Sequence, residues 1–118
     1  MQVPRPTDAD RERFRALVPD EPDVEVRPMF GNVAALVNGN MFMGLFGSAL
    51  GLKLDPAGLD DVRAAGGGHY GPPERAMKGW VSVPDSAKED QVAGWVEAAL
   101  VYVRTLSVKA AKQPRSRT

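Results

Sequence analysis

The chain has 118 residues, a net charge of zero from 15 basic and 15 acidic residues, and no cysteine. This size predicts a single domain with its own core. The lack of cysteine excludes disulfides, thiol catalysis and zinc ribbons. The balanced charge excludes a whole-molecule field that would steer the protein to nucleic acid or to an anionic membrane.

The N-terminal segment predicts a short amphipathic helix. Thr7 is a favoured N-cap residue, and Asp8 and Asp10 fall in the first turn, where the helix dipole favours negative charge. We expect this helix to end at Pro19, where an acidic loop begins. The start of the chain has no apolar segment typical of a signal peptide, and no apolar run is long enough to span a membrane. These features favour a cytoplasmic protein without membrane contact.

The segment from Val24 to Asp55 predicts three or four short strands joined by tight turns. Asn38-Gly39 is the clearest signal, because both residues tolerate the positive φ that a type I′ hairpin turn requires. A second turn is expected at Gly47-Ser48. The sequence therefore indicates an antiparallel meander.

The second half of the chain predicts two helices and one further strand or two. Asp55-Pro56 is typical of a helix start, and Gly66–Gly68 of a helix end. A strand is expected from Arg75 to Val83. Ser86 and Glu89 have the spacing of a capping box for a last helix, whose apolar stripe runs to Leu106.

Strands that cluster, rather than alternate with helices, favour an α+β fold. We expect an antiparallel sheet of four to five strands with helices packed on one face, in a single domain over residues 1–106. Residues 107–118 are predicted to form a disordered basic tail.

An ordered set of short motifs resembles the N-terminal domain of the TfoX/Sxy family over about residues 12 to 105. The motifs are Arg27-Pro28-Met29-Phe30-Gly31, the hairpin at Asn38-Gly39, Leu52-Lys53-Leu54-Asp55, Ala65-Gly66-Gly67 and Arg75-x-Met77-x-x-Trp80-x-x-Val83-Pro84. The resemblance implies a fold like that of type III secretion chaperones. The best-known members regulate bacterial natural competence together with a cyclic-AMP-responsive transcription factor, so the resemblance implies a regulatory role for a stand-alone copy of this domain.

No residue pattern predicts catalysis, a metal site or a cofactor. His69 is the single histidine, and a metal site or a catalytic triad would need further partners for it. Gly66–Gly68 follows a helix instead of opening one, which favours a helix C-cap over a phosphate cradle. The carboxylates fall at caps, in first turns and in polar loops, where a structural role is the simpler interpretation.

The strands carry a soft apolar set that alternation divides between the two faces of the sheet: Met29, Phe30, Met41, Phe42, Met43 and Phe46. Helices cover one face, and the other needs cover from a loop, a partner or a second copy. Because methionine-rich surfaces adapt to varied partners, we expect a non-enzymatic regulatory or adaptor protein that contacts a protein partner or forms a homodimer.

A binding surface is predicted from cations and apolar residues that flank the last expected strand and the first hairpin. Its candidate residues are Arg27, Met29, Phe30, His69, Tyr70, Arg75, Met77 and Lys78. Edge-strand protection is an alternative role for the cations. An alternative function is a small-molecule or nucleic-acid-modifying enzyme with a pocket near Arg27, His69 and Arg75. The basic tail is a weaker indication of nucleic-acid binding.

Overall fold

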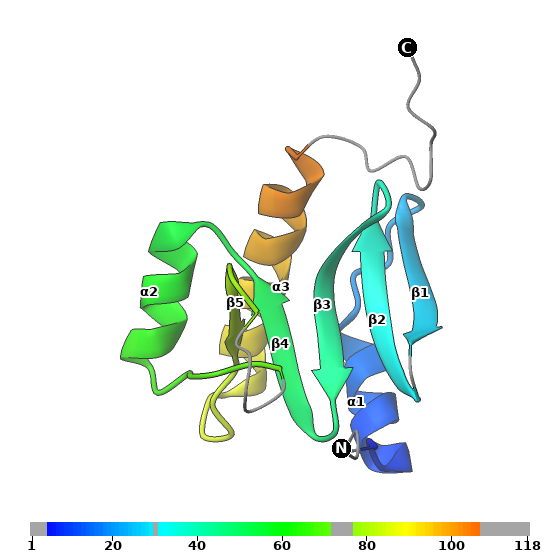
Figure 1. The fold of residues 1–118 in the computed structure, drawn as a ribbon, viewed down its shortest axis with the longest axis horizontal. Coiled ribbons are helices and arrows are strands. Elements are labelled where there is room, and N and C mark those ends of the chain that lie inside the picture. The colour runs from blue at the N-terminus through cyan, green and yellow to red at the C-terminus, as the bar shows by residue number, and fades with distance from the viewer. Residues whose placement is uncertain (1–4, 30, 72–76, 107–118) are drawn as a thin grey trace.

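The computed structural model describes residues 5–29, 31–71 and 77–106, which form a five-stranded antiparallel sheet and three helices (Figure 1). The elements are α1 (Asp8–Leu17), β1 (Val24–Met29), β2 (Asn32–Val37), β3 (Asn40–Phe46), β4 (Ala49–Lys53), α2 (Pro56–Ala64), β5 (Trp80–Ser82) and α3 (Glu89–Arg104). The predicted α+β fold is confirmed, as is the order of its elements.

Local turn chemistry sets the sheet topology, and the strands pair in sequence order from β1 to β5. Asn38 and Gly39 both have positive φ, 54° and 79°, which is the conformation of a type I′ turn. Gly47, with φ of 64°, turns β3 into β4. Only the link between β4 and β5 is long, because it contains α2.

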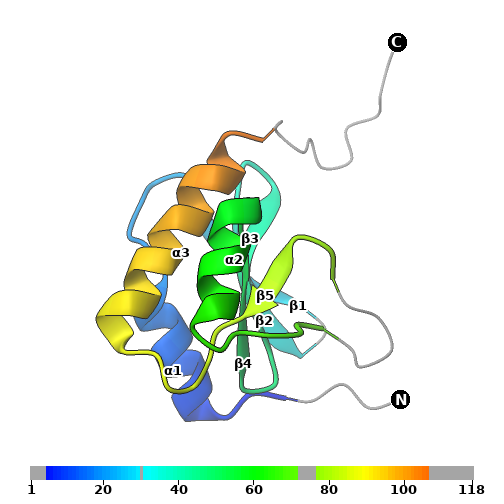
Figure 2. The same cartoon turned by 90° about the vertical axis from the view of Figure 1, so that its left-hand side faces the viewer.

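The helices lie on one side of the sheet, as expected (Figure 2). Their apolar stripes close a core in which Val92, Val96 and Leu100 of α3 are almost fully buried. The register between β2 and β3 shifts between Ala35 and Leu36. Through this β-bulge, the neighbouring residues Phe42 and Met43 both enter the core, although strict alternation would send them to opposite faces.

A loop residue covers part of the face opposite the helices. Gly44 and Gly51 are paired across β3 and β4, and without side chains they leave this face flat. The ring of Tyr70, from the loop after α2, lies on Gly51. A Cβ atom added to Gly51 would be 2.4 Å from the ring carbons, and one added to Gly44 would be 3.1 Å from the hydroxyl oxygen. Glycine is therefore needed here for close approach of the ring.

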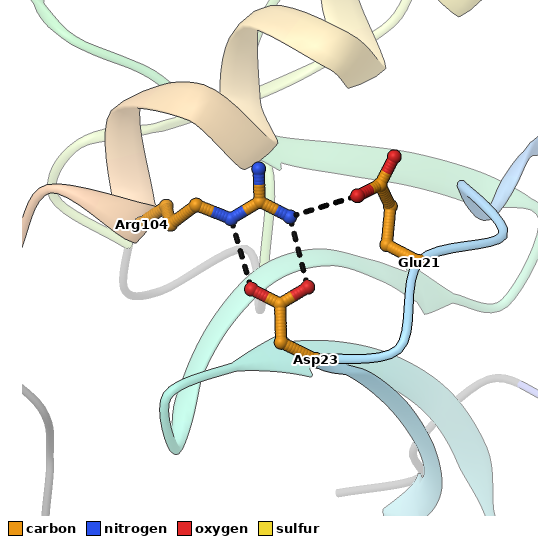
Figure 3. Close-up of polar contacts among 3 residues, drawn as sticks. All are labelled: Glu21, Asp23 and Arg104. Atoms are coloured by element: carbon orange, nitrogen blue, oxygen red, sulfur yellow. Dashed lines mark hydrogen bonds and ion pairs between the residues drawn. The ribbon is translucent and has the colours of Figure 1, made fainter.

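An ion-pair cluster joins the end of α3 to the loop before β1 (Figure 3). Arg104 donates two hydrogen bonds to the carboxylate of Asp23, both at 2.9 Å, and a longer one of 3.4 Å to Glu21. The hydrogen bond from Arg104 holds the pKa of Asp23 below its ordinary value of 3.8. The cluster fixes the Pro19–Asp23 loop beside the first strand.

Two sequence predictions need correction. The expected capping box at Ser86 is wrong: α3 has Lys88 at its N-cap and no side-chain cap. The Ala87 N–H donates to the Pro84 carbonyl in a turn, and Glu89 instead pairs with Arg13 at 2.8 Å. The strand predicted over residues 75–83 is shorter in the structure.

Residues 77–79 form a turn instead of extending the strand. The Trp80 N–H donates to the Met77 carbonyl there, and Gly79 has φ of +84°. Arg75 and the predicted tail of residues 107–118 lie outside the described residues. Within those residues, no helix has the length and apolar character needed to cross a bilayer.

The contact between Tyr70 and Gly51 predicts a specific pattern of stability changes. We expect Gly51→Ala to lower the free energy of unfolding by about 1–3 kcal/mol through overpacking. Gly44→Ala is the matched control and should lower it less, since its Cβ would lie 3.1 Å from the Tyr70 hydroxyl oxygen and at least 3.5 Å from its other neighbours. Urea denaturation measures both effects. If Gly51→Ala lowered the free energy of unfolding by the same amount when Tyr70 was already replaced by alanine, the contact would be contradicted.

The Arg104 cluster predicts a change in acid stability. The pKa of Asp23 is lower in the folded state than in the unfolded state. Ionised Asp23 therefore stabilises the fold at pH values above its unfolded-state pKa, and this stabilisation is lost as the pH falls through its folded-state pKa. In Arg104→Gln, the pKa of Asp23 should rise toward 3.8 and this pH dependence should weaken. A carboxyl-detected NMR titration measures the pKa of Asp23 in both proteins. The same pKa in the variant would show that Arg104 does not cause the lowered pKa of Asp23.

Candidate functional site

Three aromatic rings, from β3, β5 and the loop after α2, meet around Tyr70, which lies over Gly44 and Gly51. The rings of Tyr70 and Trp80 are stacked, with centroids 5.3 Å apart and an interplanar angle of 17°. Phe46 meets Tyr70 edge-on at 6.5 Å. Burial raises the pKa of the Tyr70 phenol, so this group stays protonated at neutral pH. The set forms a rigid apolar wall.

A groove of about 560 Å³ lies against this wall, between α2 and the loop that leads into β5. Two helical residues, two segments of the loop and the first residue of β5 line it. The lining residues are Leu59, Arg63, Gly67, Gly68, His69, Tyr70, Met77, Lys78, Gly79 and Trp80. The volume is typical of a site for a small molecule or for a few side chains of a peptide.

The groove combines an apolar floor with a basic edge. Arg63, His69 and Lys78 are exposed, and none of the described residues that line the groove is acidic. The Nε2 atom of His69 lies 3.1 Å from the Gly71 carbonyl oxygen, which orients the ring when that nitrogen carries the proton. Such an arrangement can hold an anionic group whose neighbours are apolar.

The structure brings together four of the predicted binding residues, namely His69, Tyr70, Met77 and Lys78. Arg27 is not among them, because it lies on β1 at the opposite edge of the sheet and pairs with Glu25 at 2.9 Å. The suggested pocket therefore does not include both Arg27 and His69. Phe30, Arg75 and the side chain of Met29 lie outside the described structure.

Six of the ten residues that line the groove are not among the predicted binding residues: Leu59, Arg63, Gly67, Gly68, Gly79 and Trp80. Trp80 falls in the strand expected from Arg75 to Val83, and the exposed Arg63 belongs to no motif. One signal was available: the helical residues Leu59 and Arg63 are four apart and therefore share one face of α2. Their position opposite Trp80 depends on the path of the loop, which no local pattern encodes.

The carboxylate of Asp10, which contacts a hydroxyl group, has a structural role. Asp10 accepts a hydrogen bond from the Thr7 N–H at 2.9 Å, which completes the predicted cap of α1, and another from the Ser48 hydroxyl at 2.8 Å. These two hydrogen bonds lower the pKa of Asp10, and the one from the Thr7 N–H has the larger effect. Over residues 5–29, 31–71 and 77–106, no three histidine, aspartate or glutamate side chains are grouped as a metal site requires.

Comparison with known proteins gives one match. The model of the TfoX N-terminal domain matches residues 12–102, which includes every element from within α1 to near the end of α3. No curated protein matches, and neither does any solved structure. The match spans most of the 118 residues and contains both the sheet and the groove. The chain belongs to the TfoX N-terminal domain family.

Proposed function

We propose that this protein is a regulatory or adaptor domain that acts through contact with a protein partner, and that the groove between α2 and β5 binds an acidic segment of that partner. Family membership supports the regulatory role. The observation that supports the binding site is that basic side chains surround the apolar floor of the groove.

The partner chemistry follows from the lining of the groove. Leu59, Met77 and Trp80 offer apolar contact, and the flexible thioether of Met77 can adapt to the shape of an inserted side chain. Arg63 and Lys78 attract carboxylates and disfavour basic segments. An acidic peptide with one large apolar side chain fits both features, with the apolar group as its anchor.

The aromatic wall makes the groove suitable for binding without chemical conversion. Tyr70 is 5% exposed and Trp80 7%, so both are fixed by packing before a ligand arrives. A preformed wall reduces the entropy lost on binding. The buried, protonated phenol of Tyr70 and the basic side chains of Arg63 and Lys78 are suited to recognition.

NMR with an acidic peptide tests the proposal. The probe is a short peptide of alternating glutamate and leucine with a single phenylalanine. We expect it to shift the indole N–H signal of Trp80, while Trp95 of α3, which does not line the groove, acts as an internal reference. A peptide with lysine in place of glutamate should leave both signals in place.

A charge-reversed variant and a matched control complete this test. Arg63→Glu with Lys78→Glu should weaken binding at least about fourfold, since two attractions of roughly 0.2–1 kcal/mol each become repulsions of similar size. Lys88→Glu reverses an exposed lysine that does not line the groove and should bind normally. An unmoved Trp80 signal, or equal loss in the control, would contradict the proposal; a response to AMP alone would favour a small-molecule site.

A further inference from the structure

The outer edge of β1 is the second surface of interest, at the opposite end of the sheet from the groove. β1 pairs with β2 on one side, and among residues 5–29, 31–71 and 77–106 no other strand pairs with it (Figure 1). Val26 lies opposite Ala35, a core residue, so it points to the helix-covered face. It nevertheless remains 42% exposed. An apolar side chain on an open sheet edge suggests a site for another strand.

Hydrogen-bonding groups along this edge restrict how a strand can add. Val37 and Asn40 are the paired residues that flank the type I′ turn, so the N–H and C=O groups of Val37 point to β3. Because these groups alternate in direction along a strand, those of Leu36 point to β1. By the same alternation, the polar backbone groups of Val24, Val26 and Pro28 point outward from the sheet.

Only one of these three residues offers an outward donor. The Val24 N–H already donates to the Glu21 carbonyl at 3.0 Å, and Pro28 has no N–H. Among the described residues of β1, the Val26 N–H is the outward donor that remains. An added strand therefore finds its best register centred on Val26.

We propose that a second copy of this chain adds to this edge, antiparallel and with its two-fold axis at Val26, so that two five-stranded sheets form one continuous sheet. In this register the Val26 N–H of each copy donates to the Val26 carbonyl of the other. Val24 of one copy lies opposite Pro28 of the other. No N–H is left unpaired there, because the Val24 N–H already donates to the Glu21 carbonyl and proline has none.

The charges along β1 are self-complementary in this register. A two-fold axis at Val26 places Glu25 of one copy opposite Arg27 of the other, and the reverse pair forms at the same time. Both side chains are about half exposed and pair within one chain at 2.9 Å. In the dimer each guanidinium lies between two carboxylates, and opposite charges across neighbouring strands are stabilising.

A shallow groove beside Val26 adds apolar area to the interface. It has a volume of about 410 Å³ and is lined by Arg15, Val18, Pro19, Asp20, Glu21, Val24 and Val26. Arg104 fixes one wall of it through Glu21 and Asp23 (Figure 3). Since a junction of two strands buries less than a standard interface, we expect reversible dimerisation with a dissociation constant below about 1 mM.

Sedimentation velocity from about 10 µM to about 1 mM tests the proposal with charge variants. Glu25→Arg and Arg27→Glu each place like charges opposite one another, and each alone should dimerise at least tenfold more weakly. Mixing these two variants restores opposite charges at both positions, so the mixture should form a heterodimer. Recovery on mixing also shows that both variants are folded.

A backbone variant tests the register independently. Val26→Pro removes the outward N–H without touching the bonds of residues 25 and 27 to β2, and it should abolish dimerisation. Val26→Thr keeps both the N–H and a β-branched side chain, and it should still dimerise. A wild-type protein that is monomeric at about 1 mM, or a dimer that all of these variants leave unchanged, would overturn the proposal.

Discussion

The contact between the Tyr70 ring and the backbone of Gly51 determines much of this structure. A side chain at Gly51 would occupy the space of the ring, and a side chain at Gly44 would press on its hydroxyl. With the ring in place, Tyr70 of the loop after α2 lies over the sheet face opposite the three described helices. Trp80 then stacks on Tyr70 and forms the wall of the groove. The proposed binding site thus depends on two glycines that do not line it.

The two proposed surfaces lie at opposite edges of one sheet, the groove next to β5 and the self-association edge on β1. In the proposed dimer the β1 edges meet at the centre, and the two grooves lie toward the outer ends of the joined sheet. Two separated grooves suit a bivalent or repeated acidic partner, because the second contact becomes intramolecular once the first has formed. Both proposals describe a protein that acts by contact.

Local signals made most of the fold predictable. Asn38-Gly39, Thr7 and Asp55 each determine a turn or a cap through neighbouring atoms, and all three do so in the structure. The prediction at Ser86 was wrong because a competing turn at Pro84 uses the same residues. The bulge that buries both Phe42 and Met43 depends on pairing with β2, and a pattern of period two does not contain it.

All residues that line the groove lie between Leu59 and Trp80, yet the groove was predictable only in part, because the way α2 meets the segment before β5 depends on tertiary packing. His69, Tyr70, Met77 and Lys78 are close in sequence, and reading them together was sufficient. Arg63 of α2 joins them through tertiary packing, whereas Trp80 follows Lys78 closely in the sequence and was expected only as a strand residue. Arg27 was grouped with them by residue type, yet four strand pairings separate β1 from β5.

The most direct test of the account is a titration of Gly51→Ala with the glutamate–leucine peptide, followed by the NMR signals of Trp80 and Trp95. The account predicts a folded protein whose Trp80 no longer responds to the peptide, because displacement of Tyr70 removes the wall of the groove. Peptide binding of unchanged strength by this variant would contradict it.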